Sequence, residues 1–593
     1  MNSEIKTCQN CKKDFVIETD DFAFYEKIKV PAPTWCPQCR LIRRMVFRNE
    51  RSLYKRKCDL CKKDIFSMYL AETSFPVYCH ECWWSDKWDS MTYGRNYNWN
   101  KSFFEQFKEL YDSVPKISLG YYPPNFNVDY SNFVRGGKNI YLSYSISNSN
   151  STGSEDIYYS YAADASKNCL DCSILNKSEN CYENIEGAQN YNSCFLVRSR
   201  DCLDSLFLFD CVNCQKCFMS SNLRNGRYIF NNQQLRKEEY EEKIKNIDFG
   251  SAKNLEAKKK EFFNLIEKSI HKFANITKAV NCTGDDINNS KNVQYSFNVH
   301  DAENCKYFVR AFFMKNAMDI GVAPTGELDY ESTGPGLNSF KVLFSMFCYN
   351  DTREISYCND IQNSSNLFGC NGLRNRHYCI LNKQYSKEEY ETLVPKIIQH
   401  MSDMPYMDKL GRVYKYGEFF PPEFSPFGYN ETIAQEFFPI DSGTATKFGY
   451  NWETEEAKNR PQPTILPENL PDHIKDVNDS ILKEIIGCAH RAECHEQCTG
   501  VFKIVQPELE FYRRANLSLP RLCPNCRHYE RLKQRNPLKL WHRQCMCDGS
   551  TSSPQAKNHP HHSGKCPNEF ETSYAPDRPE IVYCEQCYNS EVA

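Results

Sequence analysis

The chain has 593 residues, of which 40% are hydrophobic and 14% aromatic, and its formal net charge is -3. A chain of this length does not fold around a single compact core, so several structural units are expected. The near-neutral charge excludes a general electrostatic attraction to nucleic acid or to anionic membranes. Only a local patch could provide one.

No stretch of the sequence has the apolar length that a secretory signal or a membrane span needs, so we expect a cytoplasmic protein without membrane contact. The chain contains 32 cysteines. Because thiols stay reduced in the cytoplasm, closely spaced cysteine pairs there indicate metal binding and not disulfides.

Four C-x2-C pairs lie near the start of the chain, and each pair with its turn is called a knuckle here. They are Cys8 with Cys11, Cys36 with Cys39, Cys58 with Cys61, and Cys79 with Cys82. Four thiolates complete one tetrahedral zinc site, so these pairs predict two sites. We expect sequential pairing, with one module at 1–57 and another at 58–100. A cross-braced arrangement would need the middle pairs to be closer together.

The C-terminal part repeats this arrangement. Cys36, Cys39 and Cys58 recur at an offset of 487, with a matching pattern of Phe, Tyr, Pro and Arg around them. After Cys545 the offset rises to 505, because an insertion splits the first knuckle of the last module. The predicted ligands are Cys494, Cys498, Cys523 and Cys526 in a third module at 488–544, and Cys545, Cys566, Cys584 and Cys587 in a fourth module at 545–593.

Two of these knuckles are irregular and leave alternatives open. In the third module His495 falls at the place of Cys8 and competes with Cys494, and Cys488 lies nearby. In the fourth module Cys547 competes with Cys566. The insertion also holds His559, His561 and His562, which could add a ligand or form an extra weak site, although a solvated loop is the simpler interpretation.

The sequence around the second knuckles indicates two kinds of module. In the first and third modules the knuckle leads into a segment with helical periodicity, as at Leu41, Ile42 and Met45, so treble-clef variants are expected. In the second and fourth modules β-forming residues enter the last knuckle, so zinc ribbons are expected. The predicted cofactor is Zn²⁺ in four closed structural sites, which leave no open position for catalysis.

The connectors after the second knuckles of the first and third modules are strongly basic. The segment 40–57 contains eight Lys or Arg against one Glu, and the segment 527–543 contains six against one Glu. Arginines with interleaved aromatic residues suit a nucleic-acid surface. The alternative is that they only compensate the negative charge of the thiolate sites. The candidate contact residues are Arg40, Arg43, Arg44, Arg48, Arg51, Arg527, Arg531 and Arg535.

Between the modules the composition changes to Asn, Ser, Tyr and Cys. A short phrase, an Asn or Asp followed by an apolar residue, repeats every 10 to 12 residues through most of this region. Such a short period predicts a β-solenoid. We expect strands of period two with Asn at the corners, and each phrase could be only half of a coil. Inward cysteines such as Cys169 and Cys214 are expected to be core residues.

The solenoid is itself duplicated. More than half of the positions in 223–241 are identical to those in 373–391, at an offset of 150. The expected organisation is a linker at 101–130, solenoid block A at 131–232, a helix at 233–275, block B at 276–382, a cap helix at 383–400 and an aromatic, proline-rich wrapping segment at 401–487. The predicted fold class is mainly β with some α, with treble-clef and zinc-ribbon modules at both ends of a duplicated right-handed β-solenoid that has helical caps.

Four phrases of the sequence are similar to one known family. They are CPQCR at 36–40, CPNCR at 523–527, GRVYKYGEFFPPEFSPFGYNETIA at 411–434 and APDRPEIVYCEQCY at 575–588. Together they resemble a large family of uncharacterised bacterial multi-zinc-ribbon proteins. The resemblance implies zinc modules and carries no assigned reaction. The split fourth knuckle departs from that family's pattern.

Two functions from different classes fit these features. The first is a zinc-binding, non-catalytic binding or scaffold protein whose zinc modules contact nucleic acid or a protein partner. The second is a carbohydrate-active β-helix enzyme with structural zinc modules, with Asp156, Asp164, Asp171 and Asp201 as candidate acidic residues. Acidic residues at solenoid corners are usually turn residues, so the non-catalytic function is preferred. The sequence identifies no small-molecule substrate.

Overall fold

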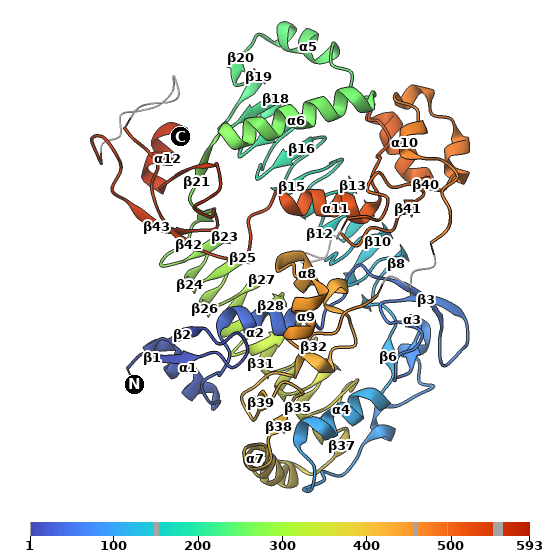
Figure 1. Ribbon diagram of the computed structural model, residues 1–593, viewed down its shortest axis with the longest axis vertical. Helices are drawn as coiled ribbons and strands as arrows, with labels where there is room; N and C mark the ends of the chain where they lie inside the picture. The colour runs from blue at the N-terminus through green and yellow to red at the C-terminus, as the bar shows by residue number, and fades with distance from the viewer. Residues whose placement is uncertain (1, 148–152, 455–459, 495, 550–560, 593) are drawn as a thin grey trace. The chain divides into compact units, whose positions relative to one another are not determined.

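The computed structural model describes residues 2–147, 153–454, 460–494, 496–549 and 561–592 (Figure 1). The fold is mainly β, with a β-solenoid, few helices and cysteine clusters at both ends of the chain. The chain divides into two compact units. Unit 1 consists of Met1–Leu119 and Ala274–Glu453, and unit 2 of Gly120–Phe273 and Thr454–Ala593.

Each unit combines one terminal pair of cysteine modules with one solenoid block. The N-terminal modules belong to unit 1 together with block B, and the C-terminal modules belong to unit 2 together with block A. The modules and the block of one unit are therefore not neighbours in the sequence. In the described part of the chain, no helix has both the length and the apolar character that crossing a bilayer would require.

The pairing of the strands fixes the length of a coil. Strand β11 (Ser154–Tyr158) pairs in parallel with β13 (Lys167–Leu170), so that Ile157 lies opposite Cys169, at an offset of 12. Strand β12 (Tyr161–Asp164) pairs with β14 (Ser173–Asn176) at the same offset. One recurring phrase thus corresponds to a complete coil, and the expectation that it could be only half of one is wrong.

The repeat along a coil is three, and not the two that the sequence suggested. Asn168, Asp171 and Ile174 all have φ between 49° and 54°, and the residue after each of them is buried. A left-handed residue at every third position turns the chain before a period-two strand can extend. Each coil therefore has four short sides.

The small polar residues of the interior satisfy backbone amides. The amide of Ser178 donates to Oγ of Ser166 at 3.2 Å, and the amide of Asn190 donates to Oγ of Ser178 at 3.1 Å. The amide of Cys202 then donates to the Asn190 side chain at 3.0 Å. Each acceptor lies one coil earlier. Because buried amides need partners, this explains why the solenoid interior is rich in Ser and Asn.

The strands of block A lie in unit 2. Strand β7 pairs with β9, and β8 and β10 to β19 pair with one another, in parallel. The last hairpin, β19 with β20, is antiparallel. The strands are β7 (Tyr121–Tyr122), β8 (Phe126–Asp129), β9 (Val134–Arg135), β10 (Gly137–Tyr141), β11, β12, β13, β14, β15 (Ile185–Ala188), β16 (Cys194–Val197), β17 (Leu206–Phe209), β18 (Gln215–Ser221), β19 (Arg227–Phe230) and β20 (Gln233–Gln234).

The strands of block B lie in unit 1. They pair in parallel, as in β23 with β25, and their last hairpin, β36 with β37, is antiparallel as in block A. They are β22 (Ile276–Thr277), β23 (Gly284–Asn288), β24 (Lys291–Gln294), β25 (Ser296–His300), β26 (Glu303–Lys306), β27 (Val309–Phe312), β28 (Met314–Ala323), β29 (Gly326–Glu327), β30 (Tyr330–Thr333), β31 (Ser339–Leu343), β32 (Met346–Tyr349), β33 (Arg353–Ser356), β34 (Asn359–Gln362), β35 (Ser365–Phe368), β36 (His377–Ile380) and β37 (Lys383–Gln384).

Two coils of block B are longer by one residue. Gly326 pairs with Ser339 and Phe340 pairs with Arg353, each at an offset of 13. The two extra residues explain why equivalent positions of the two blocks are 148 apart before these coils and 150 apart after them.

The described helices follow the blocks, belong to the modules or lie in the connecting segments. The segment 233–275, where one helix was expected, contains α5 and α6, and the expected linker at 101–130 contains α4 and the first strands of block A. The helices are α1 (Thr19–Ile28), α2 (Pro37–Met45), α3 (His80–Trp83), α4 (Phe103–Ser113), α5 (Lys237–Lys245), α6 (Ala252–Lys268), α7 (Lys387–Asp403), α8 (Ile433–Phe437), α9 (Ser442–Lys447), α10 (Gln506–Arg514), α11 (Pro524–Lys533) and α12 (Glu585–Val592).

Short strands tie the outer modules to neighbouring segments. In unit 1, β5 (Val77–Tyr78) pairs in parallel with β6 (Lys116–Ile117). In unit 2, β44 (Ile581–Tyr583) pairs in parallel with β21 (Ile270–Lys272). The aromatic segment adds a small hairpin of β38 (Tyr406–Met407) and β39 (Val413–Tyr414).

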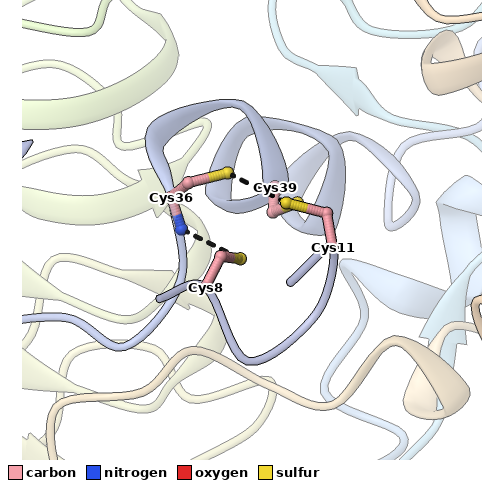
Figure 2. A group of neighbouring side chains, drawn as sticks. All are labelled: Cys8, Cys11, Cys36 and Cys39. Carbon is pink, nitrogen blue, oxygen red and sulfur yellow. Dashed lines mark hydrogen bonds between the residues drawn. The ribbon is translucent and has the colours of Figure 1, made fainter. Parts of the chain in front are cut away.

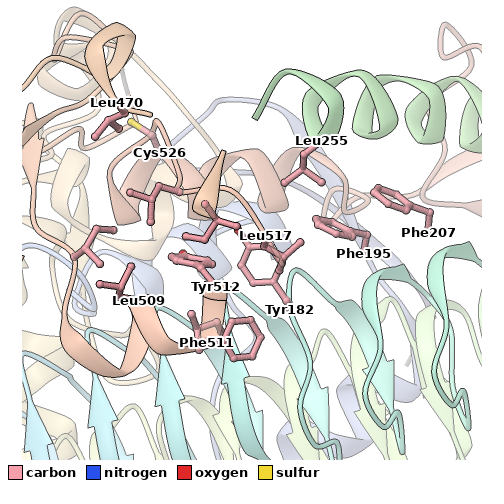
Figure 3. Packing of buried hydrophobic residues seen from close by; sticks show 14 of the residues in the cluster. Tyr182, Phe195, Phe207, Leu255, Leu470, Leu509, Phe511, Tyr512, Leu517 and Cys526 are labelled. Atoms are coloured by element: carbon pink, nitrogen blue, oxygen red, sulfur yellow. The ribbon is translucent and has the colours of Figure 1, made fainter. Parts of the chain in front are cut away.

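The modules pack on their blocks through aromatic and aliphatic side chains. In unit 2, Figure 3 shows Phe511 and Tyr512 of α10 directed at Tyr182 of block A, with Leu255 of α6 in the same cluster. In unit 1, Tyr25 of α1 lies against Tyr330 of block B, with 5.5 Å between the ring centroids. These contacts bury the inner faces of the modules.

Candidate metal sites and the buried arginine interfaces

Each module is a β-hairpin whose turn carries two cysteines, followed by two more at the start of a helix. In the first module the hairpin is β1 (Glu4–Thr7) with β2 (Asp14–Ile17), and Cys36 is the N-cap residue of α2. Figure 2 shows the four side chains of this module converging on one point. The hairpins of the other modules are β3 (Tyr54–Lys57) with β4 (Asp64–Ser67), β40 (Ile486–Gly487) with β41 (Val501–Phe502), and β42 (Trp541–Gln544) with β43 (Glu569–Thr572).

The expected division into treble clefs and ribbons is not what the structure shows. After its last knuckle the second module enters α3, for which Cys79 is the N-cap residue, and the fourth module enters α12. All four modules therefore have the same order of hairpin, knuckle and helix. The β-forming residues before the last knuckle make up β5 and β44, which do not prevent a helix after it.

Two hydrogen bonds distinguish the first cysteine of the group in every module. The amide of that cysteine donates across the turn at 2.8 to 2.9 Å, from Cys8 to Lys13, Cys58 to Lys63, Cys488 to Gly500 and Cys545 to Asn568. Its sulfur accepts the amide of the third cysteine at 3.2 Å in all four modules, in the pairs Cys8 with Cys36, Cys58 with Cys79, Cys488 with Cys523 and Cys545 with Cys584.

In the third module this geometry brings together a group that differs from the predicted one at one cysteine. The four-cysteine group of the third module is Cys488, Cys498, Cys523 and Cys526, so Cys488 takes the place of the predicted Cys494. The sequence did contain a signal, because the phrase Glu-Ile-x-x-Cys that ends at Cys8 recurs and ends at Cys488. Cys494 is an additional thiol, with its sulfur 3.7 Å from that of Cys526. The competitor His495 lies outside the described residues.

The remaining predicted cysteines come together as their spacing suggested. The other groups are Cys8, Cys11, Cys36 and Cys39; Cys58, Cys61, Cys79 and Cys82; and Cys545, Cys566, Cys584 and Cys587. Cys566 belongs to this last group although the insertion separates it from Cys545. Its competitor Cys547 is also buried, and its carbonyl accepts the amide of Cys566 at 2.8 Å.

The sulfur separations fit metal coordination. A tetrahedron with metal–sulfur bonds of about 2.3 Å has edges of about 3.8 Å. A disulfide would instead require about 2.05 Å. The four groups can therefore each hold one tetrahedral ion. The separations are 3.8 Å for Cys11 with Cys36, Cys61 with Cys79, Cys488 with Cys526 and Cys498 with Cys523, and 3.9 Å for Cys566 with Cys584.

Local hydrogen bonds favour one thiolate in each of two groups. Those from Cys36 and Cys39 hold the pKa of Cys8 well below its ordinary value. Those from Cys488, Cys498 and Cys526 hold the pKa of Cys523 well below its ordinary value. In the same groups the neighbouring sulfurs and burial raise the pKa of Cys39 and of Cys526, so one thiol of each group is deprotonated most readily.

The insertion of the fourth module places two histidines against the same sulfurs. Nε2 of His561 and Nε2 of His562 lie 3.2 and 3.3 Å from Sγ of Cys587, and Nε2 of His561 lies 3.8 Å from Sγ of Cys566. These four residues form a second group whose ligand atoms could hold a metal ion. His559 lies outside the described residues.

In unit 1 two arginines of α2 converge on one buried aspartate of block B. Arg40 donates to Asp319 from Nε at 2.9 Å, and its Nη2 lies 2.8 Å from the same oxygen. Nη2 of Arg44 lies 3.3 Å from the other Asp319 oxygen. The three side chains are at most 2% exposed. Burial alone would lower the pKa of Arg40, but the Asp319 carboxylate raises it well above its ordinary value.

The third arginine of this helix has two acidic partners. Arg43 is paired with Glu331 of β30 and, at 2.9 Å, with Glu418 of the aromatic segment. Burial raises the pKa of Glu331 to about 6, although Arg43 and Arg44 oppose the shift. Buried charges of this kind depend on their partners, because an unpaired charge inside a protein is strongly unfavourable.

In unit 2 the same contact forms between α11 and block A. Nη1 of Arg527 and Nη1 of Arg531 lie 2.6 and 2.8 Å from the two oxygens of Asp171. Arg531 also donates to the carbonyl of Tyr159 at 3.0 Å, and the guanidinium of Arg527 lies over the Tyr159 ring at 4.5 Å. One aspartate thus receives two arginines from one helix in each unit.

The two interfaces are copies of each other. The ring centroids of Tyr25 and Tyr330 are 5.5 Å apart in unit 1, and those of Tyr512 and Tyr182 are 5.9 Å apart in unit 2. Aligning the two blocks at an offset of 148 would have revealed this repeat in the sequence. The equivalent residues are Arg40 and Arg527, Arg44 and Arg531, and Tyr25 and Tyr512, at an offset of 487, together with Asp171 and Asp319, Tyr159 and Tyr307, and Tyr182 and Tyr330, at an offset of 148.

The same kind of ion pair occupies all the arginines that had predicted a nucleic-acid surface. Every candidate arginine has a carboxylate partner within its unit, and each of these arginine side chains is at most 7% exposed. The candidates therefore do not form an exposed basic surface. In addition to the pairs above, they are Arg48 with Glu50 at 2.6 Å, Arg51 with Glu436 at 3.2 Å, and Arg535 with Glu186 at 3.0 Å.

A second pair of contacts joins the outer modules to the blocks. In unit 1 the guanidinium of Arg374 lies over the ring of Trp83 at 5.0 Å. In unit 2 the equivalent Arg224 donates to the hydroxyl of Tyr588 at 2.7 Å and lies 3.2 Å from Asp210. Trp83 and Tyr588 correspond at the offset of 505. The guanidinium of Arg224 also lies over the Tyr588 ring at 5.9 Å, so both units have a cation–π contact here, and the hydrogen bond to a side-chain hydroxyl is the part that unit 2 adds.

The acidic residues proposed for a carbohydrate-active enzyme either pair with other side chains or lie at turns. Asp171 is the buried partner of Arg527 and Arg531. Asp156 accepts from Asn139 at 2.8 Å, and Asp164 accepts from Asn176 at 3.3 Å. Asp201 has a φ of 56° and is exposed at a corner.

Comparison with protein-family models, with curated proteins and with solved structures finds no match to the chain. The function therefore has to be inferred from the geometry of the chain itself.

Proposed function

We propose that this protein is a non-catalytic, zinc-dependent scaffold that binds a macromolecular partner through its exposed surfaces. Zinc is the metal that closed four-cysteine sites with C-x2-C pairs normally hold, because it accepts tetrahedral thiolate coordination without redox chemistry. The similarity of CPQCR and CPNCR to bacterial multi-zinc-ribbon proteins supports the same assignment.

One observation carries the proposal. The basic helix that leaves the first or third metal site makes a buried contact with an aspartate of a solenoid block, Asp319 or Asp171. A metal ion that fixes the start of this helix also fixes its arginines on the block. We infer that zinc holds the modules on the solenoid blocks, where it stabilises a long surface and takes part in no reaction.

Of the two partner classes, we propose a protein. A nucleic-acid surface needs basic side chains that can reach phosphates. The arginines that suggested such a surface are engaged with carboxylates instead. The cytoplasmic location expected from the sequence remains part of this proposal.

Metal analysis of the purified full-length chain tests the zinc assignment. We expect at least four zinc ions per chain by inductively coupled plasma mass spectrometry, and loss of the folded state when a strong chelator removes them. A chain that is folded and free of metal would overturn the proposal.

Retention on immobilised mixed nucleic acid tests the partner class. We expect no retention at about 0.15 M salt beyond that of an acidic control protein of similar size. Strong retention that falls steeply with salt concentration would restore nucleic acid as the partner.

A further inference from the structure

The fourth module gathers more ligands than one tetrahedral ion can use. Its four cysteines form one group, and His561 and His562 form a second group with two of the same cysteines, Cys566 and Cys587. In both groups all the ligand atoms lie within 4.8 Å of one another. A tetrahedral ion accepts four ligands, whereas six are gathered here.

The distances between the imidazoles and the sulfurs are close to those that a shared metal requires. Metal–sulfur and metal–nitrogen bonds of about 2.3 and 2.05 Å at a tetrahedral angle place S and N about 3.5 Å apart. The observed separations from Cys587 are 3.2 Å for His561 and 3.3 Å for His562, and His561 lies 3.8 Å from Cys566. Both rings present Nε2 to the same sulfur.

We propose that the fourth module holds two divalent ions that share the thiolates of Cys566 and Cys587. One ion completes its coordination with Cys545 and Cys584, and the other with His561 and His562. This inference rests on the proposed function, because it requires the first ion to occupy the four-cysteine site. It gives the insertion in the fourth module a role as the source of a new metal site.

Charge favours the second ion. One divalent ion with four thiolates carries a net charge of -2, whereas two divalent ions with four thiolates and two neutral imidazoles carry none. The four cysteines are at most 5% exposed and lie in an apolar cluster with Tyr583, Tyr588 and Val592. Because burial of net charge is unfavourable, neutralisation stabilises this centre.

The position of the histidines provides access for the second ion. His561 and His562 are half-buried, whereas the cysteines that they contact are buried. The second ion can therefore enter from the solvent side after the four-cysteine site has been filled. We expect this outer ion to be held more weakly, because it is bound by two neutral ligands and by two thiolates that already bind another ion.

Counting bound zinc in full-length variants tests the proposal. We expect five ions per chain in the wild type and four in the double variant His561→Ala/His562→Ala, after equilibration with Zn²⁺ and removal of free metal. His542→Ala is the matched control, because His542 lies in the same hairpin, is exposed and contacts Glu569 and Glu571. This control should retain five ions.

Cobalt gives a second measurement that a merely structural role of the histidines would not change. In the Co²⁺-loaded chain, two ions that share thiolates should couple magnetically. Part of the electron paramagnetic resonance signal would then be lost, and the double variant should recover it.

Each other outcome overturns the proposal in a recognisable way. Four ions in both the wild type and the double variant would show that the histidines bind no metal. Four ions in the wild type and three in the variant would show that they serve a single ion. Five ions in both would place the extra ion elsewhere. In these three cases the proposed function stands. A chain without bound metal would contradict both the second ion and the proposed function.

Discussion

The two units have the same construction, but their metal modules differ in regularity. In unit 1 the first knuckle of each module has the two-residue spacing, at Cys8 and Cys11 and at Cys58 and Cys61. In unit 2 both first knuckles are interrupted, between Cys488 and Cys498 and between Cys545 and Cys566. Each interruption leaves the backbone hydrogen bonds of the first ligand intact. The comparison shows that a knuckle tolerates insertion as long as its two ends still meet across the hairpin.

The insertions also add possible ligands. Cys494 lies near Cys526 in the third module, and His561 and His562 lie near Cys587 in the fourth. Unit 1 therefore serves as the reference for a plain four-cysteine site, and unit 2 shows how such a site can be elaborated. The pairing of two arginines with one aspartate, by contrast, is the same in both units.

The largest expected effect is the loss of a first ligand. Cys8→Ser and Cys488→Ser should each remove one zinc ion and unfold the unit that carries it, because a structural zinc contributes about 10 kcal/mol or more to small zinc domains. Metal analysis together with limited proteolysis and mass spectrometry would identify the unfolded unit. Cys494→Ser is the matched control and should retain the ion. If Cys494→Ser lost it and Cys488→Ser did not, the ligand assignment in the third module would be wrong.

The next effect comes from the buried aspartates. Asp319→Asn and Asp171→Asn each remove the carboxylate that two buried arginines share. Arg44 keeps Glu331 at 3.9 Å and Arg527 keeps Glu508 at 3.4 Å, so we expect each change to lower the free energy of unfolding by about 3 kcal/mol. Asparagine tolerates the positive φ of these positions, so the change removes charge without adding backbone strain. Calorimetry of the two variants should show similar losses.

The control for this pair is Asp201→Asn, at an exposed corner with a similar φ. We expect a change of no more than about 0.5 kcal/mol there. If the control lost as much free energy of unfolding as the buried variants, the arginine contacts would not be what stabilises both units.

A difference in pH dependence should separate the interiors of the two blocks. Burial raises the pKa of Asp329 in unit 1 to about 7, and this residue accepts from Ser339 and from the amide of Val342. At the offset of 148 its equivalent in unit 2 is Cys181. Because the folded state still binds a proton that the unfolded state releases near pH 4, stability falls as the pH rises from about 4 to about 7.

Asp329→Asn should remove the share of this dependence that Asp329 contributes, about 2 to 4 kcal/mol over the full range, while the raised pKa values of Glu331 and Asp360 keep a smaller fall in the variant. Denaturant unfolding of the wild type and the variant between pH 5.5 and 8 would measure the upper part of it while the thiolate sites keep their metal. Parallel pH profiles for the two proteins would contradict the assignment to Asp329.

The smallest effect concerns the outer modules. Tyr588→Phe in unit 2 removes the hydroxyl that Arg224 and Asp210 share, and we expect a loss of about 1.5 kcal/mol in thermal unfolding. In unit 1 the equivalent contact is a cation–π contact of Arg374 and contains no such hydroxyl. The control is Tyr191→Phe, because the Tyr191 side chain is exposed on block A. Equal losses in the two variants would show that the hydroxyl of Tyr588 contributes nothing to the contact.

Much of the fold followed from local patterns in the sequence. The spacing of the cysteines predicted four modules, and the change of offset from 487 to 505 placed Cys566 in the fourth ligand group. The recurring Asn and Asp phrases predicted a duplicated solenoid. The length of a coil and the repeat along it were predicted wrongly. A left-handed residue at every third position replaces the alternation of an ordinary strand, and composition alone does not show this.

What the sequence determined by itself is the chemistry of the modules, because a C-x2-C pair and its hairpin need only neighbouring residues to form. Three features were decided only by the tertiary structure. They are the combination of the N-terminal modules with block B, the burial of the arginines against Asp319 and Asp171, and the choice of Cys488 over Cys494. Each depends on groups that only folding brings together. An arginine that looks free in the sequence can therefore be fully paired in the protein, because the surface on which its helix packs comes from a distant part of the chain.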